Sequence, residues 1–148
     1  MERALKTLLP GGRFVNVSAQ RARVMARIRG RNNKSTERQF RMALVRAGVS
    51  GWTLHPSSVT GRPGFYFIRR RVAVFVDGCF WHGCPKCGNK PKTRPEFWSA
   101  KLASNRRRDR KTSRLLRQRG IHVIRIWEHS LSPTILAEVL ERLLGALE

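Results

Sequence analysis

The spacing of apolar residues predicts the order helix, two or three strands, helix, strand, helix along the chain. Ser35 or Thr36 is expected to cap the first helix, with Gln39 completing a capping box and Gly48 ending the element. The buried face of this helix is predicted to comprise Phe40, Ala43, Leu44 and Ala47. Short apolar runs predict strands at Trp52 to His55, Phe65 to Arg69, Val72 to Asp77 and Ile121 to Trp127.

Two further helices are predicted in the second half of the chain. Thr93 is a candidate cap and Pro95 a first helical position for a long helix that runs toward Gly120. An amphipathic helix is expected after Ser132 and Pro133. No internal repeat, low-complexity tract or linker divides the sequence, so we expect one α/β domain over residues 18–148. Within it, residues 18–34 form a basic arm that orders on DNA, and residues 1–17 are expected to be a flexible tail.

The charge balance narrows the choice of partner. The 148 residues include 31 Lys and Arg against 9 Asp and Glu, a formal net charge of +22, which points to a polyanion. Nucleic acid is the leading partner, and a membrane surface is the weaker alternative, because no apolar run approaches the roughly 18 residues of a spanning helix. Met1 to Gly12 lack the apolar segment of a secretory signal, so we expect an intracellular protein.

Three cysteines lie within nine residues of one another and predict a metal site. An odd number of thiols cannot form a closed disulfide framework. Cys84 and Cys87 have the two-residue spacing that lets two thiolates bind one Zn²⁺, and Cys79 is near enough to join them. His129 is the expected fourth ligand, since it follows the strand that should lie beside the strand that delivers Cys79. A redox role, or simple burial of the thiols, is the alternative, and the other histidines, His55 and His122, are expected to be ordinary polar positions.

The loop with the cysteines carries further chemistry. Asp77 ends an apolar strand, where α/β proteins usually place functional residues, and Phe80, Trp81 and His82 follow it. An ordinary apolar core does not require this mixture of a carboxylate, an imidazole, thiols and aromatic rings. The loop is therefore a candidate functional site.

These residues, in their order and spacing, resemble the very-short-patch-repair (Vsr) endonucleases. The resemblance rests on Arg27 to Gly30 with Glu37, Gly61 to Pro63, Val74 to His82, Phe97 and Trp98 with Lys101, Asn105 with Asp109, and Ile126 to Glu128. It covers Ser18 to about Leu131. It implies a restriction-endonuclease-like core, in which helices flank a mixed sheet, with a structural zinc site. The implied activity is a Mg²⁺-dependent nick 5′ to the thymine of a T:G mismatch left by deamination of 5-methylcytosine.

The resemblance also implies catalytic residues. The backbone carbonyl of Val76 and the carboxylate of Asp77 would hold Mg²⁺, His82 would be the general base, and Glu37 would assist a metal-bound water. Relatives carry a metal-binding aspartate after Gly-Arg-Pro, where this chain has Gly64. Either this copy is catalytically impaired, which we expect, or Asp77 and Glu37 together hold a displaced metal ion. The plainer readings are a first-turn helix acid for Glu37, a strand-end turn residue for Asp77, and a zinc ligand or surface histidine for His82.

Aromatic and basic side chains are the expected DNA contacts. In the family, the residues that match Phe80, Trp81 and Trp98 intercalate beside the mismatch, at an unstacking cost of about a few kcal/mol per step. The alternative is that they cover the zinc loop against the long helix. The other expected DNA contacts are Arg27, Arg62, Lys101, Asn105 and Arg106. The basic run that begins at Arg106 is expected to contact phosphates rather than bases.

Two functions of different class are therefore predicted. The first is a Vsr-type DNA mismatch endonuclease whose activity is impaired by Gly64. The second is a zinc-stabilised module that binds mismatched or distorted duplex without cutting it, and an RNA-binding protein is a third reading. We expect a monomer in the bacterial cytoplasm, associated with the nucleoid, with mismatch-repair proteins as partners that the family implies.

Overall fold

Four strands form a mixed sheet in the described part of the chain, which in the computed structural model comprises residues 18–20, 23, 34–88 and 91–148. The strands lie in the order β1 (Trp52–Leu54), β2 (Phe65–Phe67), β3 (Val72–Asp77) and β4 (His122–Trp127). The first two pairs are antiparallel, whereas β3 and β4 are parallel with Asp77 opposite Trp127. Because two parallel strands end at the same edge of a sheet, the segments that follow β3 and β4 leave the sheet side by side.

The predicted N-terminal segments lie almost entirely outside the described residues. This applies to the predicted tail, 1–17, to most of the predicted basic arm, 18–34, and to Arg27 within it.

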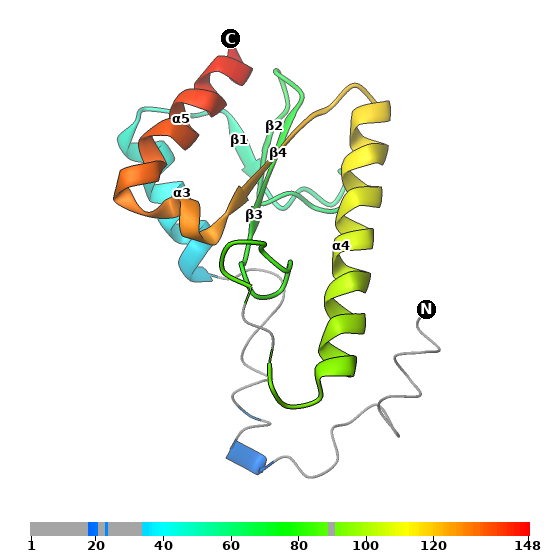
Figure 1. Cartoon of the computed structure of the whole chain (residues 1–148). Helices are drawn as coiled ribbons and strands as arrows, with labels where there is room; N and C mark the ends of the chain where they lie inside the picture. Colours follow the sequence, from blue (N-terminus) through cyan, green and yellow to red (C-terminus); the bar gives the residue numbers. More distant parts are fainter. Residues whose placement is uncertain (1–17, 21–22, 24–33, 89–90) are drawn as a thin grey trace.

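Helices cover both faces of the sheet (Figure 1). α3 (Lys34–Arg46) and α5 (Pro133–Leu147) lie on one face, and α4 (Pro95–Gln118) lies on the other. A 3₁₀ helix, η2 (Glu128–Leu131), links β4 to α5. This arrangement confirms the predicted mixed α/β fold. None of the helices in the described ranges is both long enough and apolar enough to cross a membrane.

Each face of the sheet has its own apolar core. The core under α3 and α5 includes Phe40, Leu44, Phe65, Val72, Val74, Ile124, Ile126 and Leu143. The core under α4 consists of Val59, Ala73, Phe75, Leu116, Ile121 and Val123, with Tyr66 against it. Successive residues of a strand point to opposite faces, so Asp77 shares the α4 face with Phe75, and Arg125 shares it with Val123. Strand alternation thus carries a carboxylate and a guanidinium to the face that the basic helix covers.

The helix predicted near Ser35 and Thr36, α3, begins earlier than predicted. Ser35 and Thr36 lie inside α3 instead of capping it, and Thr36 is buried, which a solvent-facing cap would not be. The predicted end of this helix is confirmed, because Gly48 takes a φ of 69°, as glycines that follow a helix commonly do.

Two residues with a left-handed backbone conformation determine where α4 begins and where β1 ends. Arg94, with a φ of 55°, precedes α4 in place of the predicted Thr93. His55 has a φ of 46°, which is incompatible with extended backbone, so β1 stops at Leu54. Neither residue is a glycine, so the sequence carried no signal for these conformations.

Candidate active site and metal centre

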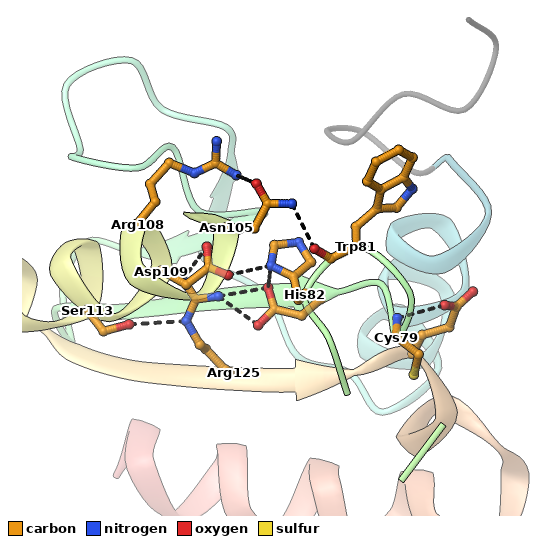
Figure 2. A network of polar contacts seen from close by, with 10 residues as sticks. Cys79, Trp81, His82, Asn105, Arg108, Asp109, Ser113 and Arg125 are labelled. Carbon is orange, nitrogen blue, oxygen red and sulfur yellow. Dashed lines mark hydrogen bonds and ion pairs between the residues drawn. The ribbon is translucent and has the colours of Figure 1, made fainter. Parts of the chain in front are cut away.

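His82 lies between two carboxylates on the α4 side of the sheet. Its Nδ1 is 2.6 Å from Asp109 Oδ2 and 3.8 Å from Asp77 Oδ1. Asp77 ends β3, His82 belongs to the loop that follows, and Asp109 comes from α4. Figure 2 shows the imidazole of His82 facing the carboxylate of Asp109. The structure therefore brings the predicted Asp77 and His82 together and adds Asp109, to which no role was assigned from the sequence.

Arg125, in β4, joins these groups to one another (Figure 2). Its Nη1 donates to both oxygens of Asp77, at 2.9 and 2.7 Å, and its Nη2 lies 3.6 Å from Asp109 Oδ1. Its Nε donates to Ser113 Oγ at 3.1 Å, and its guanidinium carbon lies 4.5 Å from the centre of the Phe75 ring. The catalytic and metal-binding roles of Asp77 stay predictions, and in this structure both of its oxygens accept from a guanidinium.

The surroundings of Asp109 favour its ionised form. Burial would raise its pKa, but the hydrogen bond with His82, the charge of that imidazole and the nearby Arg125 and Arg108 together lower the pKa of Asp109 below its ordinary value. An ionised Asp109 can accept from the Nδ1–H of His82, and in the neutral form of the ring Nε2 is then the acceptor nitrogen. Among the described residues, Nε2 of His82 has no hydrogen-bond partner. His82 is thus arranged to take a proton.

Asp109 and Arg125 both had a signal in the sequence. Asn105, Asp109 and Ser113 recur every four residues, so they share one face of a helix whose other positions are mostly basic. Arg125 is a charged residue in the middle of an otherwise apolar strand. A charge at such a position is stable only with a partner, and that requirement could have identified it.

A second cluster joins Glu37, His55 and the position of Gly64. Glu37 Oε2 lies 2.9 Å from His55 Nε2. A Cβ added to Gly64 would lie 3.2 Å from Glu37 Oε1 and 3.7 Å from the carbonyl oxygen of Val74. Burial raises the pKa of Glu37, although the charge and hydrogen bond of His55 act in the opposite direction. His55, expected to be an ordinary polar position, is therefore the partner of a predicted catalytic carboxylate, and Gly64 faces that same carboxylate.

Cys79, Cys84, Cys87 and His129 form one cluster, as predicted. Their candidate ligand atoms all lie within 4.8 Å of one another, and His129 Nδ1 is 3.3 Å from Cys79 Sγ and 3.5 Å from Cys84 Sγ. Thiolates about 2.3 Å from a tetrahedral Zn²⁺ lie about 3.8 Å apart, so three sulfurs and one imidazole nitrogen at this spacing fit the ion. The parallel pairing of β3 with β4 brings the cysteine loop next to η2, which carries His129. The cluster could hold a metal ion such as zinc.

The thiols of this cluster differ in acidity. Burial raises the pKa of Cys79 to about 12, with the neighbouring thiols Cys84 and Cys87 adding to the rise and a backbone hydrogen bond at His129 opposing it. Burial would also raise the pKa of Cys84, but hydrogen bonds from the backbone at Cys87 and Lys86 lower it below its ordinary value. Without a metal ion, Cys84 is therefore nearer to a thiolate than Cys79.

Neighbouring side chains hold the cysteine loop in place. The backbone N–H of Cys79 donates to Glu128 Oε2 at 3.1 Å. Asn105 Nδ2 donates to the backbone carbonyl of Trp81 at 2.9 Å, as Figure 2 shows. Asn105 is only 5% exposed, so its position in this structure supports the loop, and its predicted contact with DNA stays a prediction.

Four aromatic rings pack together between the loop and α4. They are Phe80, Trp81, Phe97 and Trp98, with ring centres 5.2 to 6.0 Å apart. Phe97 and Trp98 are buried, whereas Phe80 and Trp81 are partly exposed. In this structure Trp98 covers the loop against the helix, as the alternative interpretation required, and the two loop aromatics reach the surface.

The outer face of α4 is strongly basic. Its exposed cations are Arg106, Arg107, Arg108, Arg110, Lys111, Arg114 and Arg117. Lys101 is half-buried on the same helix, and Arg62 is exposed in the turn before β2. This face adjoins the cluster around His82, since Asp109 comes from the same helix.

The fold and these clusters define a class. A mixed sheet between helices, with carboxylates and an imidazole at the end of a central strand and a basic helix beside them, is the arrangement of an α/β nuclease domain. The family model described as DNA mismatch endonuclease Vsr matches residues 15–87. A type II nicking enzyme of Lentzea aerocolonigenes, V.NaeI, is 36% identical over 139 residues, which are 91% of this chain and 78% of that enzyme. The chain belongs to the Vsr family of DNA endonucleases.

Further relatives agree with this assignment. The nicking enzyme V.XorIIP of Xanthomonas oryzae is 36% identical over 135 residues, 89% of this chain and 90% of that protein. The DNA mismatch endonuclease Vsr of Escherichia coli is 33% identical over 118 residues, 79% of this chain and 74% of that protein. The predicted family and its restriction-endonuclease-like fold are thereby confirmed.

Proposed function

We propose that this chain is a Vsr-type nicking endonuclease that binds duplex DNA at a T:G mismatch and cuts 5′ to the thymine. Family membership supports DNA as the substrate. The observation that carries the proposal is the His82–Asp109 pair. Nδ1 of His82 is hydrogen-bonded to Asp109, and Nε2 has no protein partner among the described residues. Partly exposed aromatic side chains and a basic helix lie beside this pair. Such an enzyme would work on genomic DNA with other mismatch-repair proteins.

Within this proposal, His82 is the general base. Its Nε2 takes a proton from a water molecule as the water oxygen attacks phosphorus. The bond between phosphorus and the leaving oxygen breaks, and that oxygen takes a proton from solvent. Asp109 fixes the tautomer of the ring and balances the positive charge that forms on it. General-base catalysis of this kind contributes about 10²- to 10⁴-fold to a rate.

The residues present do not fit the Mg²⁺ ion that the family implies. Mg²⁺ takes oxygen ligands and is usually held by one or two carboxylates together with waters and phosphates. Glu37, Asp77 and Asp109 each have an imidazole or guanidinium partner, and Gly64 offers no side-chain oxygen. The backbone carbonyl of Val76 is the remaining predicted donor. We therefore propose that Gly64 impairs cleavage and leaves recognition intact.

We further propose that Phe80 and Trp81 form a wedge at the mismatch. Both are partly exposed and are backed by the buried rings of Phe97 and Trp98, so they present a rigid apolar edge. An inserted wedge unstacks bases at a cost that is smallest where pairing is already weak. The basic face of α4 would hold the phosphates on either side.

A non-cutting module that recognises mismatched or distorted duplex is the second candidate function. The observation that favours it is the same gap at Gly64, together with the pairing of every carboxylate in the two clusters. This module would share the recognition surface and the metal centre with the endonuclease and would differ only in chemistry.

Strand nicking separates the two functions. The substrate is a labelled duplex with one T:G mismatch in a cytosine-methylation sequence, with Mg²⁺, and binding to the same duplex is measured in parallel. The unaltered chain is compared with Gly64→Asp and with Gly64→Asn, which has the same shape without the charge. A Cβ at this position would lie 3.2 Å from Glu37 Oε1, the end of a flexible side chain that can shift, and 3.7 Å from the carbonyl oxygen of Val74.

We expect all three chains to prefer the T:G duplex and only Gly64→Asp to cut at a substantial rate. A fast nick by the unaltered chain would mean that Asp77 and Glu37 hold a displaced metal ion. If Gly64→Asp binds but does not cut, the non-cutting module is supported. A chain that does not distinguish T:G from fully paired DNA would refute the mismatch proposal.

A further inference from the structure

Two carboxylates compete for one proton of His82. Nδ1 lies 2.6 Å from Asp109 Oδ2 and 3.8 Å from Asp77 Oδ1, and the side chains of the two acids are only 17% and 6% exposed. A single N–H donates one strong hydrogen bond, so the ring pairs with one acid or the other. Both acceptor oxygens lie within 3.8 Å of Nδ1, so a modest rotation of the imidazole would exchange them.

Arg125 binds Asp77, so that Asp77 does not compete with Asp109 for the proton of His82. Its Nη1 donates to both oxygens of Asp77, at 2.9 and 2.7 Å, which satisfies that carboxylate without His82. Its Nη2 faces Asp109 at Oδ1, 3.6 Å away, and leaves Oδ2 for the imidazole. We propose that Arg125 is a positioning residue that assigns His82 to Asp109 by holding Asp77.

The guanidinium group is itself fixed on three sides. Nε donates to Ser113 of α4 at 3.1 Å, and the group stacks over Phe75 of β3 with its carbon 4.5 Å from the ring centre. Arg125 thus connects β3, β4 and α4, the three elements that carry or flank the acids. A lysine could pair with Asp77, but its single ammonium group could not reach Ser113 and Asp109 at the same time.

The assignment has a catalytic consequence, which rests on the proposed function. When Asp109 holds Nδ1, the ring is anchored to α4 and Nε2 has no protein partner in the described ranges. If Asp77 held Nδ1 instead, the ring would turn toward the end of β3, and Nε2 would leave the position from which it takes a proton. The choice of carboxylate is a property of the free protein and can be measured whether or not the chain cuts DNA.

Proton NMR of the His82 ring tests the choice directly. A short hydrogen bond moves the Nδ1 proton far downfield, and its resonance is assigned by its loss in His82→Gln. With Arg125 present, we expect Asp109→Asn to shift this resonance strongly and Asp77→Asn to leave it nearly unchanged. In the Arg125→Met background we expect the reverse dependence.

Two further variants keep the test valid if Arg125→Met folds poorly. Arg125→Met combined with Asp77→Asn leaves no uncompensated buried charge, and it should keep the resonance in its Asp109-dependent position. Arg125→Lys should show intermediate behaviour. Arg142→Met removes an exposed arginine from α5, on the opposite face of the sheet, and should leave the spectrum unchanged. A resonance that still follows Asp109 in Arg125→Met would overturn the proposal.

Single-turnover nicking provides the catalytic readout in whichever chain cuts, the unaltered one or Gly64→Asp. We expect Arg125→Met to slow the nick by about 100-fold, the lower range for a misplaced general base, with unchanged affinity for the duplex and partial recovery in Arg125→Lys. An unchanged nicking rate would refute the catalytic consequence. If no chain cuts, the proposed function fails, and the resonance alone decides the role of Arg125.

Discussion

The affinity of the Cys79, Cys84, Cys87 and His129 cluster for zinc is expected to rise steeply with pH. A thiol must lose its proton before it can bind the ion, so each thiol that is protonated in the metal-free protein makes binding release one proton. Cys79 is such a thiol, because burial raises its pKa to about 12. The zinc-bound state is therefore favoured as pH rises and lost as pH falls.

The size of the effect is set by the number of protons released. If only Cys79 releases a proton, the affinity for zinc rises about tenfold per pH unit, which is a change of about 1.4 kcal/mol in binding free energy. If Cys84 also releases a proton, the rise reaches about 100-fold per unit. Because the pKa of Cys84 is lowered, this thiol loses its proton at a lower pH than Cys79 does. As pH rises, Cys84 is therefore the first of the two to stop contributing to the slope. Between pH 6 and 8 the total change is thus at least about 100-fold.

Competition with a chelator of known affinity at pH 6, 7 and 8 measures this slope. Cobalt substitution provides an absorbance signal for the thiolates, and elemental analysis should find one zinc per chain, lost in Cys84→Ser. Cys79→Ser should reduce the slope by about one proton. Cys87→Ser removes an exposed ligand of the same cluster and opens no cavity, so its comparison with Cys79→Ser separates the loss of a ligand from the loss of packing. An affinity that is independent of pH, or a folded chain that does not bind zinc, would refute the reasoning.

Two other predictions concern the acid near Gly64 and the basic helix. Glu37→Gln should raise the melting temperature at pH 8 and lose this advantage by pH 4, because a partly buried acid with a raised pKa costs stability once pH rises through that pKa. An equal difference in melting temperature at both pH values would contradict this. Replacing Arg106 and Arg107 by Gln should weaken binding to mismatched and paired duplexes alike and reduce the slope of log affinity against log salt by about 0.9 per lost phosphate contact, measured by fluorescence anisotropy. A change confined to the mismatched duplex would instead mean that these arginines read the mismatch.

The metal cluster was predictable from the sequence because most of its information is local. Three thiols within nine residues leave few alternatives, and the fourth ligand required one long-range inference, that two apolar strands lie side by side. The parallel register of Val72 with His122 through Asp77 with Trp127 satisfies that inference. The strand Val72–Asp77 was predictable for the same reason, since its apolar run is continuous. The long helix was predictable from Pro95 at its start, Gly120 after its end and the apolar residues near each end.

The ion pairs were not predictable, because they depend on geometry between distant segments. Whether Arg125 meets Asp77 is decided by the register of β3 and β4, and a shift of one residue would turn Arg125 to the opposite face. The contact between Glu37 and His55 depends on a left-handed backbone at His55, which no glycine signals. Sequence patterns identified the residue types at the site, and the three-dimensional structure was needed to determine their partners.

Gly64 lies apart from the contacts of His82, the cysteine–histidine cluster and the aromatic cluster. The nearest atoms to a side chain at this position belong to Glu37 and to the backbone of Val74, so the absence of an acid here changes none of the contacts of His82. The metal cluster is held by Glu128 and by its own ligands, and the aromatic cluster is held by its own ring contacts. A chain that lost its metal-binding aspartate would therefore keep the general base and the recognition surface in place. Under the proposal that Gly64 impairs cleavage, Gly64→Asp is therefore expected to raise the nicking rate while the contacts of His82 and the binding of duplex DNA stay unchanged.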